Sequence, residues 1–259
     1  MSVERRGHVA LVGFHRPPHN FFDAELVRGI CDAMEGAQGD GSSRVVVLWS
    51  EGRNFCAGAN IRTGAVGAPG TAYGIADVTR APLDLYRQGI RLFRCELPVV
   101  AAVQGAAVGG GLGLALAADF RMATPRTRFH CNFAGIGFHH GFGLTVTLPA
   151  VVGQQRAWRL LYTGGQLRGT EALEAGLCDG IVPSERLLDA SIELAQSMAA
   201  AGPLAVRSIR RTMRDGLADR VWQAMVAESR AQAALADTAD FAEGVRAAAE
   251  RRPANWVGR

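Results

Sequence analysis

The sequence contains no lysine, and all 28 of its basic residues are arginine. This absence excludes a Schiff-base nucleophile, a covalently attached pyridoxal phosphate and the lysine of a P-loop. The five cysteines are scattered and include no C-x-x-C pair. They predict reduced, buried thiols rather than a disulfide framework or a zinc centre, and no metal site is expected.

Long hydrophobic runs are also missing, because Gly, Asp or Arg interrupts each one before it reaches the roughly 20 residues of a membrane span. The N-terminal residues lack the apolar segment and cleavage site of a secretory signal. These absences predict a cytoplasmic protein with no membrane partner. A length of 259 residues with 48% hydrophobic and 20% charged residues predicts one large domain, or a domain with a small appendage.

The net charge is modestly positive, at +4. Most arginines are spread along the chain, but four of them gather within residues 207–214 on an expected helix. This cluster has three interpretations: a solvated helix face, a contact for a phosphate-bearing ligand, or an RNA contact.

Alternating apolar runs and amphipathic segments predict an α/β fold. Strands are expected at 8–14, 44–49, 98–103, 119–123 and 128–133. Helices are expected at 25–37 with Asp23 as N-cap, then at 84–94, 111–118, 148–163, 170–176, 184–201, 204–217 and 220–251. The segment 63–81, rich in Gly, Ala and Thr, is expected to form a mobile loop or lid.

Two glycine-rich segments carry the strongest chemical signal: 55–62 (FCAGANIR) and 109–113 (GGGLG). Each follows an expected buried strand, and the second leads directly into a helix. Small residues allow close approach of a ligand to the backbone and leave peptide N–H groups free to donate. Two such donors converging on one oxygen would form an oxyanion hole, which stabilises developing negative charge.

Five motifs in order resemble the crotonase (enoyl-CoA hydratase/isomerase) superfamily. They are FHRPPHN at 14–20, FCAGANIR at 55–62 with Asn60 in place of the usual Asp, PVVAAVQGAAVGGGLG at 98–113, the stretch from TG at 163–164 through AGL at 175–177 to VP at 182–183, and the stretch from EG at 243–244 to RP at 252–253. The resemblance implies a β/α spiral core, residues 1–195, that binds acyl-CoA. It also implies a helical C-terminal region, residues 196–259, that mediates a homotrimer, often paired into a hexamer.

The resemblance further implies a coenzyme A thioester as substrate, with no permanently bound cofactor and with nucleic acid not expected as a partner. By matching positions, the oxyanion donors would be the backbone N–H groups of Ala59 and Gly110. Coenzyme A binding would involve Ala57, Ala59, Asn60, Ile61, Arg62 and Gly110.

The sequence departs from the family at the two glutamates that hold water in its hydratases. Gly113 stands at the first position and Phe133 at the second. Neither residue transfers a proton, so hydration by the two-glutamate route is excluded. The resemblance then leaves isomerisation, decarboxylation or C–C cleavage through a thioester enolate. The alternative is a catalytically silent member of the fold that binds acyl-CoA or RNA.

The pair His139-His140 lies in the glycine-rich stretch 135–143 (GIGFHHGFG). In decarboxylase- and dehalogenase-like relatives, this neighbourhood supplies a catalytic tyrosine or aspartate. A histidine titrating near neutral pH suits acid–base catalysis. His140, and with it His139, is therefore a candidate acid–base residue; the alternative is that both rings fill space or bind backbone.

Overall fold

Two β-sheets form the centre of the molecule, a computed structural model that describes residues 1–60 and 82–259. The strands are β1 (Ser2–Arg6), β2 (Val9–Phe14), β3 (Val45–Ser50), β4 (Val99–Val103), β5 (Ala106–Val108), β6 (Phe120–Ala123), β7 (Arg128–His130), β8 (Gln166–Arg168) and β9 (Gly180–Ile181). The larger sheet has the order β1-β2-β3-β4-β6-β9, and the smaller has the order β5-β7-β8. The expected loop at 63–81 lies outside the described residues.

The central strands are buried on both faces, which explains their continuous apolar sequences. In β2, Val9 and Leu11 face one hydrophobic cluster while Ala10 and Val12 face the other. Strands β3 and β4 alternate in the same way. The smaller cluster is completed by Ile192, Ala195 and Ala199 of the helix that covers its face.

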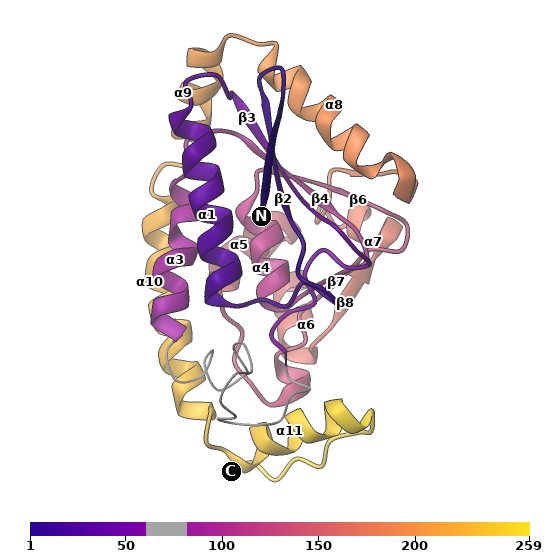
Figure 1. The fold of residues 1–259 in the computed structure, drawn as a ribbon. Helices are drawn as coiled ribbons and strands as arrows, with labels where there is room; N and C mark the ends of the chain where they lie inside the picture. Colours follow the sequence, from indigo (N-terminus) through magenta and orange to yellow (C-terminus); the bar gives the residue numbers. More distant parts are fainter. Residues whose placement is uncertain (61–81) are drawn as a thin grey trace.

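The helices enclose the sheets from both sides (Figure 1). They are α1 (Ala24–Gly39), α3 (Pro82–Arg94), α4 (Gly110–Ala117), α5 (Leu144–Val152), α6 (Gln154–Thr163), α7 (Gly169–Glu174), α8 (Leu187–Ala199), α9 (Pro203–Met213), α10 (Leu217–Leu235) and α11 (Ala239–Glu250), with short 3-10 turns η1 (Ala134–Ile136) and η2 (Ser184–Arg186). Helix α8 packs on β2, β3, β4 and β6, whereas α1, α3 and α10 lie side by side on the opposite side.

Most expected elements are present, including the helix capped by Asp23, whose carboxylate accepts from the Leu26 amide at 2.8 Å. The expected helix 148–163 is instead two helices, because Gly153 takes a left-handed φ of 79° between α5 and α6. The expected helix 220–251 also ends early, and Thr238 caps a separate α11. Strand β1 was not predicted, since all five of its residues are exposed.

The C-terminal helices pack on the core at several points. Helix α10 contacts α3 and α5, and the expected boundary between residues 195 and 196 falls inside α8. The division into a core and an oligomerisation region stays a prediction. In the part of the chain that the structure describes, no helix is long and apolar enough to cross a membrane.

The clustered arginines of α9 and the turn after it bind carboxylates within the chain. Arg207 pairs with Glu96 at 2.5 Å, while Arg210 and Arg214 both pair with Asp119, at 2.8 and 2.5 Å. These two carboxylates, Glu96 and Asp119, offset part of the positive charge that suggested an RNA contact.

Candidate active site

The two glycine-rich segments lie side by side in the structure. Cys56 forms an isolated parallel bridge with Ala107: its amide donates to the Ala106 carbonyl, and the Val108 amide donates to the Cys56 carbonyl, both at 3.0 Å. A Cβ at Gly111 would lie 2.3 Å from the Cys56 carbonyl oxygen, so only glycine permits this approach. The residues that follow Cys56 therefore lie beside the N-terminal end of α4.

The predicted donors Ala59 and Gly110 both line one cavity at this place. Gly58 turns the chain with a φ of 79°, and its carbonyl accepts from the Phe22 amide at 2.9 Å. Gly110 is the first residue of α4, where helix amides have no intrahelical acceptor. Within residues 1–60 and 82–259, neither the Ala59 nor the Gly110 amide has a hydrogen-bond partner. Both N–H groups are thus available to a ligand.

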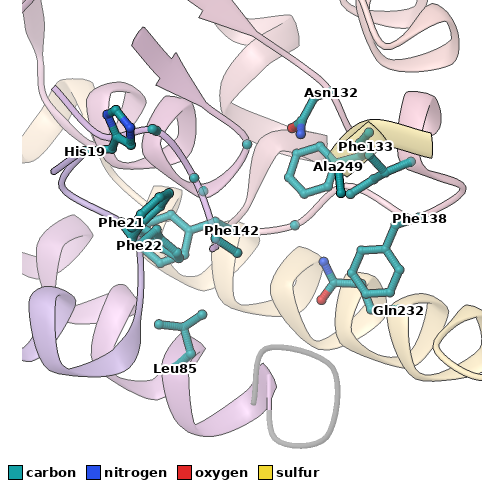
Figure 2. Close-up of a pocket in the computed structure, with 18 of the residues that line it drawn as sticks. His19, Phe21, Phe22, Leu85, Asn132, Phe133, Phe138, Phe142, Gln232 and Ala249 are labelled. Carbon is teal, nitrogen blue, oxygen red and sulfur yellow. The ribbon is translucent and has the colours of Figure 1, made fainter. Parts of the chain in front are cut away.

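The cavity has a volume of about 300 Å³ and a largely aromatic wall (Figure 2). Its lining residues are His19, Phe21, Phe22, Ala57, Gly58, Ala59, Leu85, Tyr86, Gly109, Gly110, Asn132, Phe133, Ile136, Phe138, Gly141, Phe142, Gln232, Ala248, Ala249 and Arg251. No carboxylate is among these residues, all of which belong to the described part of the chain. A preformed aromatic cavity with Ala59 and Gly110 in its lining is suited to binding an acyl group.

Comparison with known proteins gives the same family as the motifs. The family model described as enoyl-CoA hydratase/isomerase matches residues 4–259. This chain belongs to the enoyl-CoA hydratase/isomerase family. The match covers both glycine-rich segments and every element from β2 to α11.

Relatives within this enoyl-CoA hydratase/isomerase family cover almost the whole chain. The chain is 31% identical over 258 residues to Enoyl-CoA hydratase EchA19 of Mycobacterium tuberculosis, covering 99% of this chain and 96% of that protein. It is 30% identical to the crotonyl-CoA hydratase of Syntrophomonas wolfei, covering 99% and 97%. A solved enoyl-CoA hydratase/isomerase from Pseudoalteromonas atlantica matches with a TM-score of 0.85 and 28% identity over 99% of both chains. The molecule has the crotonase fold.

The resemblance matched Gly113 and Phe133 to the two hydratase glutamates, and an aromatic ring lies at or beside each of these positions. Phe133 itself lines the cavity. Gly113 is buried in α4, and a Cβ there would lie 2.9 Å from Cδ1 of Phe142. Phe142 holds its ring in this place with a left-handed φ of 61°. A larger side chain at position 113 would therefore collide with the Phe142 ring as it stands.

The predicted pair His139-His140 lies beside the cavity but is not among the residues that line it. The two rings stack with centroids 4.2 Å apart, and the rings of His140 and Phe133 form a T-shaped pair with centroids 6.5 Å apart. Nε2 of His140 is 2.9 Å from Oγ1 of Thr145. Burial, together with the neighbouring His139, lowers the pKa of His140 to about 4. His140 is therefore neutral near pH 7, and its catalytic role stays a prediction.

Glu228 is a buried carboxylate that the sequence analysis did not single out. It accepts from the amides of Gly143 and Thr145 at 2.8 and 2.9 Å, and from Oγ1 of Thr145 at 2.6 Å. Nε2 of His140 lies 3.8 Å from one of its oxygens. Burial raises the pKa of Glu228, although these hydrogen bonds oppose the rise. Glu228 fixes the loop that carries Phe142.

Gln232 fixes the same loop from the next turn of α10. Its Nε2 donates to the His139 carbonyl at 3.1 Å, and its Oε1 accepts from the Tyr86 hydroxyl at 2.8 Å. Both Gln232 and Tyr86 line the cavity, and neither was predicted. The spacing of Glu228 and Gln232 places them on one face of α10. This four-residue spacing was the signal that the sequence offered, but the same spacing is typical of a solvent-exposed helix face.

The remaining predicted ligand contacts fall in three groups. Ala57 lines the cavity, and its amide donates to the His19 carbonyl at 3.2 Å. Asn60 is half-buried directly after Ala59. Ile61 and Arg62 lie outside the described residues. Asn132 was missed as a site residue; its amide points into the cavity (Figure 2).

Proposed function

We propose that this protein is an enzyme that binds an acyl-CoA thioester and stabilises its enolate at the amides of Ala59 and Gly110. The observation that carries the proposal is that Ala59 and Gly110, whose amides have no partner among the described residues, both line one apolar cavity. Membership of the enoyl-CoA hydratase/isomerase family and the names of its relatives support a coenzyme A ligand. No permanently bound cofactor is needed. We propose that Ala57, Asn60, Ile61 and Arg62 contact the coenzyme A portion.

In the proposed complex, the thioester oxygen accepts hydrogen bonds from both amides. Charge that develops on this oxygen is stabilised further by the N-terminal end of α4, which Gly110 begins. Because the donors are fixed by the backbone and face an apolar cavity, they need no rearrangement during the reaction. Loss of one such donor typically raises a barrier by about 3–4 kcal/mol.

Decarboxylation is the reaction that the described walls support best. The bond between C2 and a carboxylate on C2 breaks, CO₂ leaves, and the electron pair moves into the enolate, whose oxygen is held by Ala59 and Gly110. Water then protonates C2. This sequence needs no protein base to form the enolate, which fits a cavity whose described lining includes no carboxylate. Isomerisation and C–C cleavage through the same enolate are the alternative reactions.

His140 and His139 keep a proposed acid–base role in the steps that move a proton. The hydrogen-bonded series from His140 through Thr145 to Glu228 joins the edge of the cavity to a buried carboxylate. Replacement by His140→Ala tests the role directly. An unchanged rate would remove His140 from the mechanism.

The experiment that tests the proposed function incubates the protein with four classes of acyl-CoA: 2-enoyl, 3-enoyl, 3-hydroxyacyl, and acyl carrying a carboxylate on C2. We expect turnover of the last class, with CO₂ release, and no hydration of 2-enoyl-CoA. Gly110→Ala should lower turnover, since its Cβ would lie 2.6 Å from the Phe22 ring. Gly36→Ala is the matched control, because a Cβ there meets nothing within 4 Å.

A catalytically silent acyl-CoA-binding protein is the second candidate, favoured by the replacement of both glutamates by Gly113 and Phe133. Tight binding of acyl-CoA in calorimetry, without turnover of any class, would support it. An RNA-binding role is disfavoured by the ion pairs of Arg207, Arg210 and Arg214. RNA binding that is sensitive to salt and survives saturation with coenzyme A would contradict that view.

A further inference from the structure

Six of the side chains that line the cavity are aromatic: Phe21, Phe22, Tyr86, Phe133, Phe138 and Phe142. They come from segments far apart in the sequence. In Figure 2, Phe21, Phe22 and Phe142 lie on one side of the cavity and Phe133 and Phe138 on the other. Among the described lining residues, the larger aliphatic side chains are only Leu85 and Ile136. The wall is therefore built mainly of flat, rigid surfaces rather than flexible chains.

Contacts between rings hold the aromatic wall in place. Phe22 meets Phe142 edge-on, with centroids 4.9 Å apart and planes at 90°. Phe138 stacks on Phe241 outside the cavity, at 4.4 Å. Phe22, Phe138 and Phe142 are all nearly inaccessible to solvent. A ligand therefore meets a preformed wall and does not have to order it on binding.

Two of the polar side chains that line the cavity, Tyr86 and Gln232, already have partners in the protein. The Tyr86 hydroxyl donates to Gln232, and Gln232 donates to the His139 carbonyl. Arg251, the one cation in the described lining, is exposed at the end of α11. Around Tyr86 and Gln232, the wall thus favours an apolar end of the acyl chain over a polar or charged one.

We propose, on the basis of the function proposed above, that the acyl group of the substrate carries an aromatic ring. Aromatic rings prefer edge-to-face and offset contacts with other rings, and the fixed walls offer several such partners. The size agrees: a cavity of roughly 150 Å³ lined by apolar side chains holds benzene. The volume of about 300 Å³ found here accommodates a ring together with the short chain that joins it to the thioester.

The test measures dissociation constants, by calorimetry on the full chain, for three saturated thioesters with equal numbers of acyl carbons. They are 3-phenylpropanoyl-CoA, 3-cyclohexylpropanoyl-CoA and nonanoyl-CoA. We expect the phenyl compound to bind about tenfold more tightly than either of the others. The cyclohexyl compound controls for size and the nonanoyl compound for hydrophobicity. Equal or tighter binding of either control thioester would overturn the inference and leave the proposed function intact.

Variants locate the preference in the wall. Phe22→Leu and Phe138→Leu should each reduce the phenyl preference by about threefold or more while changing nonanoyl-CoA affinity little. Phe129→Leu is the matched control, because Phe129 is buried but does not line the cavity. A preference unchanged in both wall variants would overturn the assignment. Failure of the folded wild-type protein to bind all three thioesters would instead refute the proposed function itself.

Discussion

At position 113, the backbone leaves space that the ring of Phe142 fills. A Cβ at Gly113 would approach Cδ1 of Phe142 to 2.9 Å and its Cβ to 3.0 Å. Phe142 reaches this position only through a left-handed backbone conformation, which is uncommon for a bulky residue. The small residue and the large one therefore form a pair, and glycine at position 113 is coupled to the position of the Phe142 ring.

This pairing predicts a change of sign in a double-mutant cycle. Gly113→Ala should destabilise the wild-type protein by about 1–3 kcal/mol through overpacking. In a Phe142→Gly background, the same substitution should stabilise by about 0.5–1 kcal/mol, as alanine usually does within a helix. Urea denaturation measures both effects. Equal effects of Gly113→Ala in the two backgrounds would show that the pair is not coupled.

The buried His140 predicts a specific dependence of stability on pH. Its pKa is lowered from 6.5 to about 4, so the unfolded state takes up the proton first as the pH falls. The stability that this group contributes is present above pH 6.5 and is lost as the pH falls toward 4. The loss amounts to at most about 3 kcal/mol. His140→Gln should flatten the decline measured by urea denaturation between these pH values.

The free energy of unfolding of His140→Gln should still depend on pH through other groups. One of them is His130, whose pKa is also lowered by burial. A decline as steep in the variant as in the wild type would show that His140 is not the group responsible.

Among the elements, α10 anchors the loop of residues 139–145. Glu228 and Gln232, one turn apart, bind the loop through its amides, a hydroxyl and a carbonyl. The loop in turn presents Gly141 and Phe142 to the cavity. A helix outside the glycine-rich segments thus determines the shape of one cavity wall.

Glu228→Gln tests this connection. In the variant, an NH₂ group would replace one carboxylate oxygen and would face the N–H donors of Gly143 or Thr145. A buried donor would then be unpaired, at a cost of about 1–3 kcal/mol. Both the melting temperature and kcat/KM should fall. Glu193→Gln is the control, since Glu193 pairs with Arg186 on an exposed helix face. A Glu228→Gln variant as stable as Glu193→Gln would contradict the role of α10.

The sequence predicted those elements whose signal is local. The apolar strands β2, β3 and β4 and the cap of α1 by Asp23 follow from neighbouring residues. Strand β1 was missed because its exposed residues lack an apolar pattern. The role of Glu228 could not be predicted, since its partners Gly143 and Thr145 lie 85 and 83 residues away in sequence.

At the scale of the whole molecule, α9 exposes large apolar side chains. Leu204, Ile209 and Met213 are 81%, 63% and 79% exposed. The family resemblance implies a trimer, and these side chains offer a surface for a second copy of the chain. We expect wild-type protein to sediment as a trimer or hexamer.

Ile209→Glu with Met213→Glu should shift the sedimentation of the protein toward the monomer. Gln196→Glu on α8 adds the same kind of charge at an exposed site and should leave the assembly unchanged. Monomeric wild-type protein would contradict the oligomer prediction. An intact trimer in the double variant would show that α9 does not form the interface.

The most direct test of the central claim is infrared spectroscopy of a bound acyl-CoA labelled with ¹³C at the thioester carbonyl. Hydrogen bonds from the amides of Ala59 and Gly110 should lower the C=O stretching frequency below its value for the same thioester in water. Gly36→Ala should keep this lowered frequency, and Gly110→Ala should lose part of it. A bound carbonyl whose frequency equals or exceeds the value in water would contradict the account.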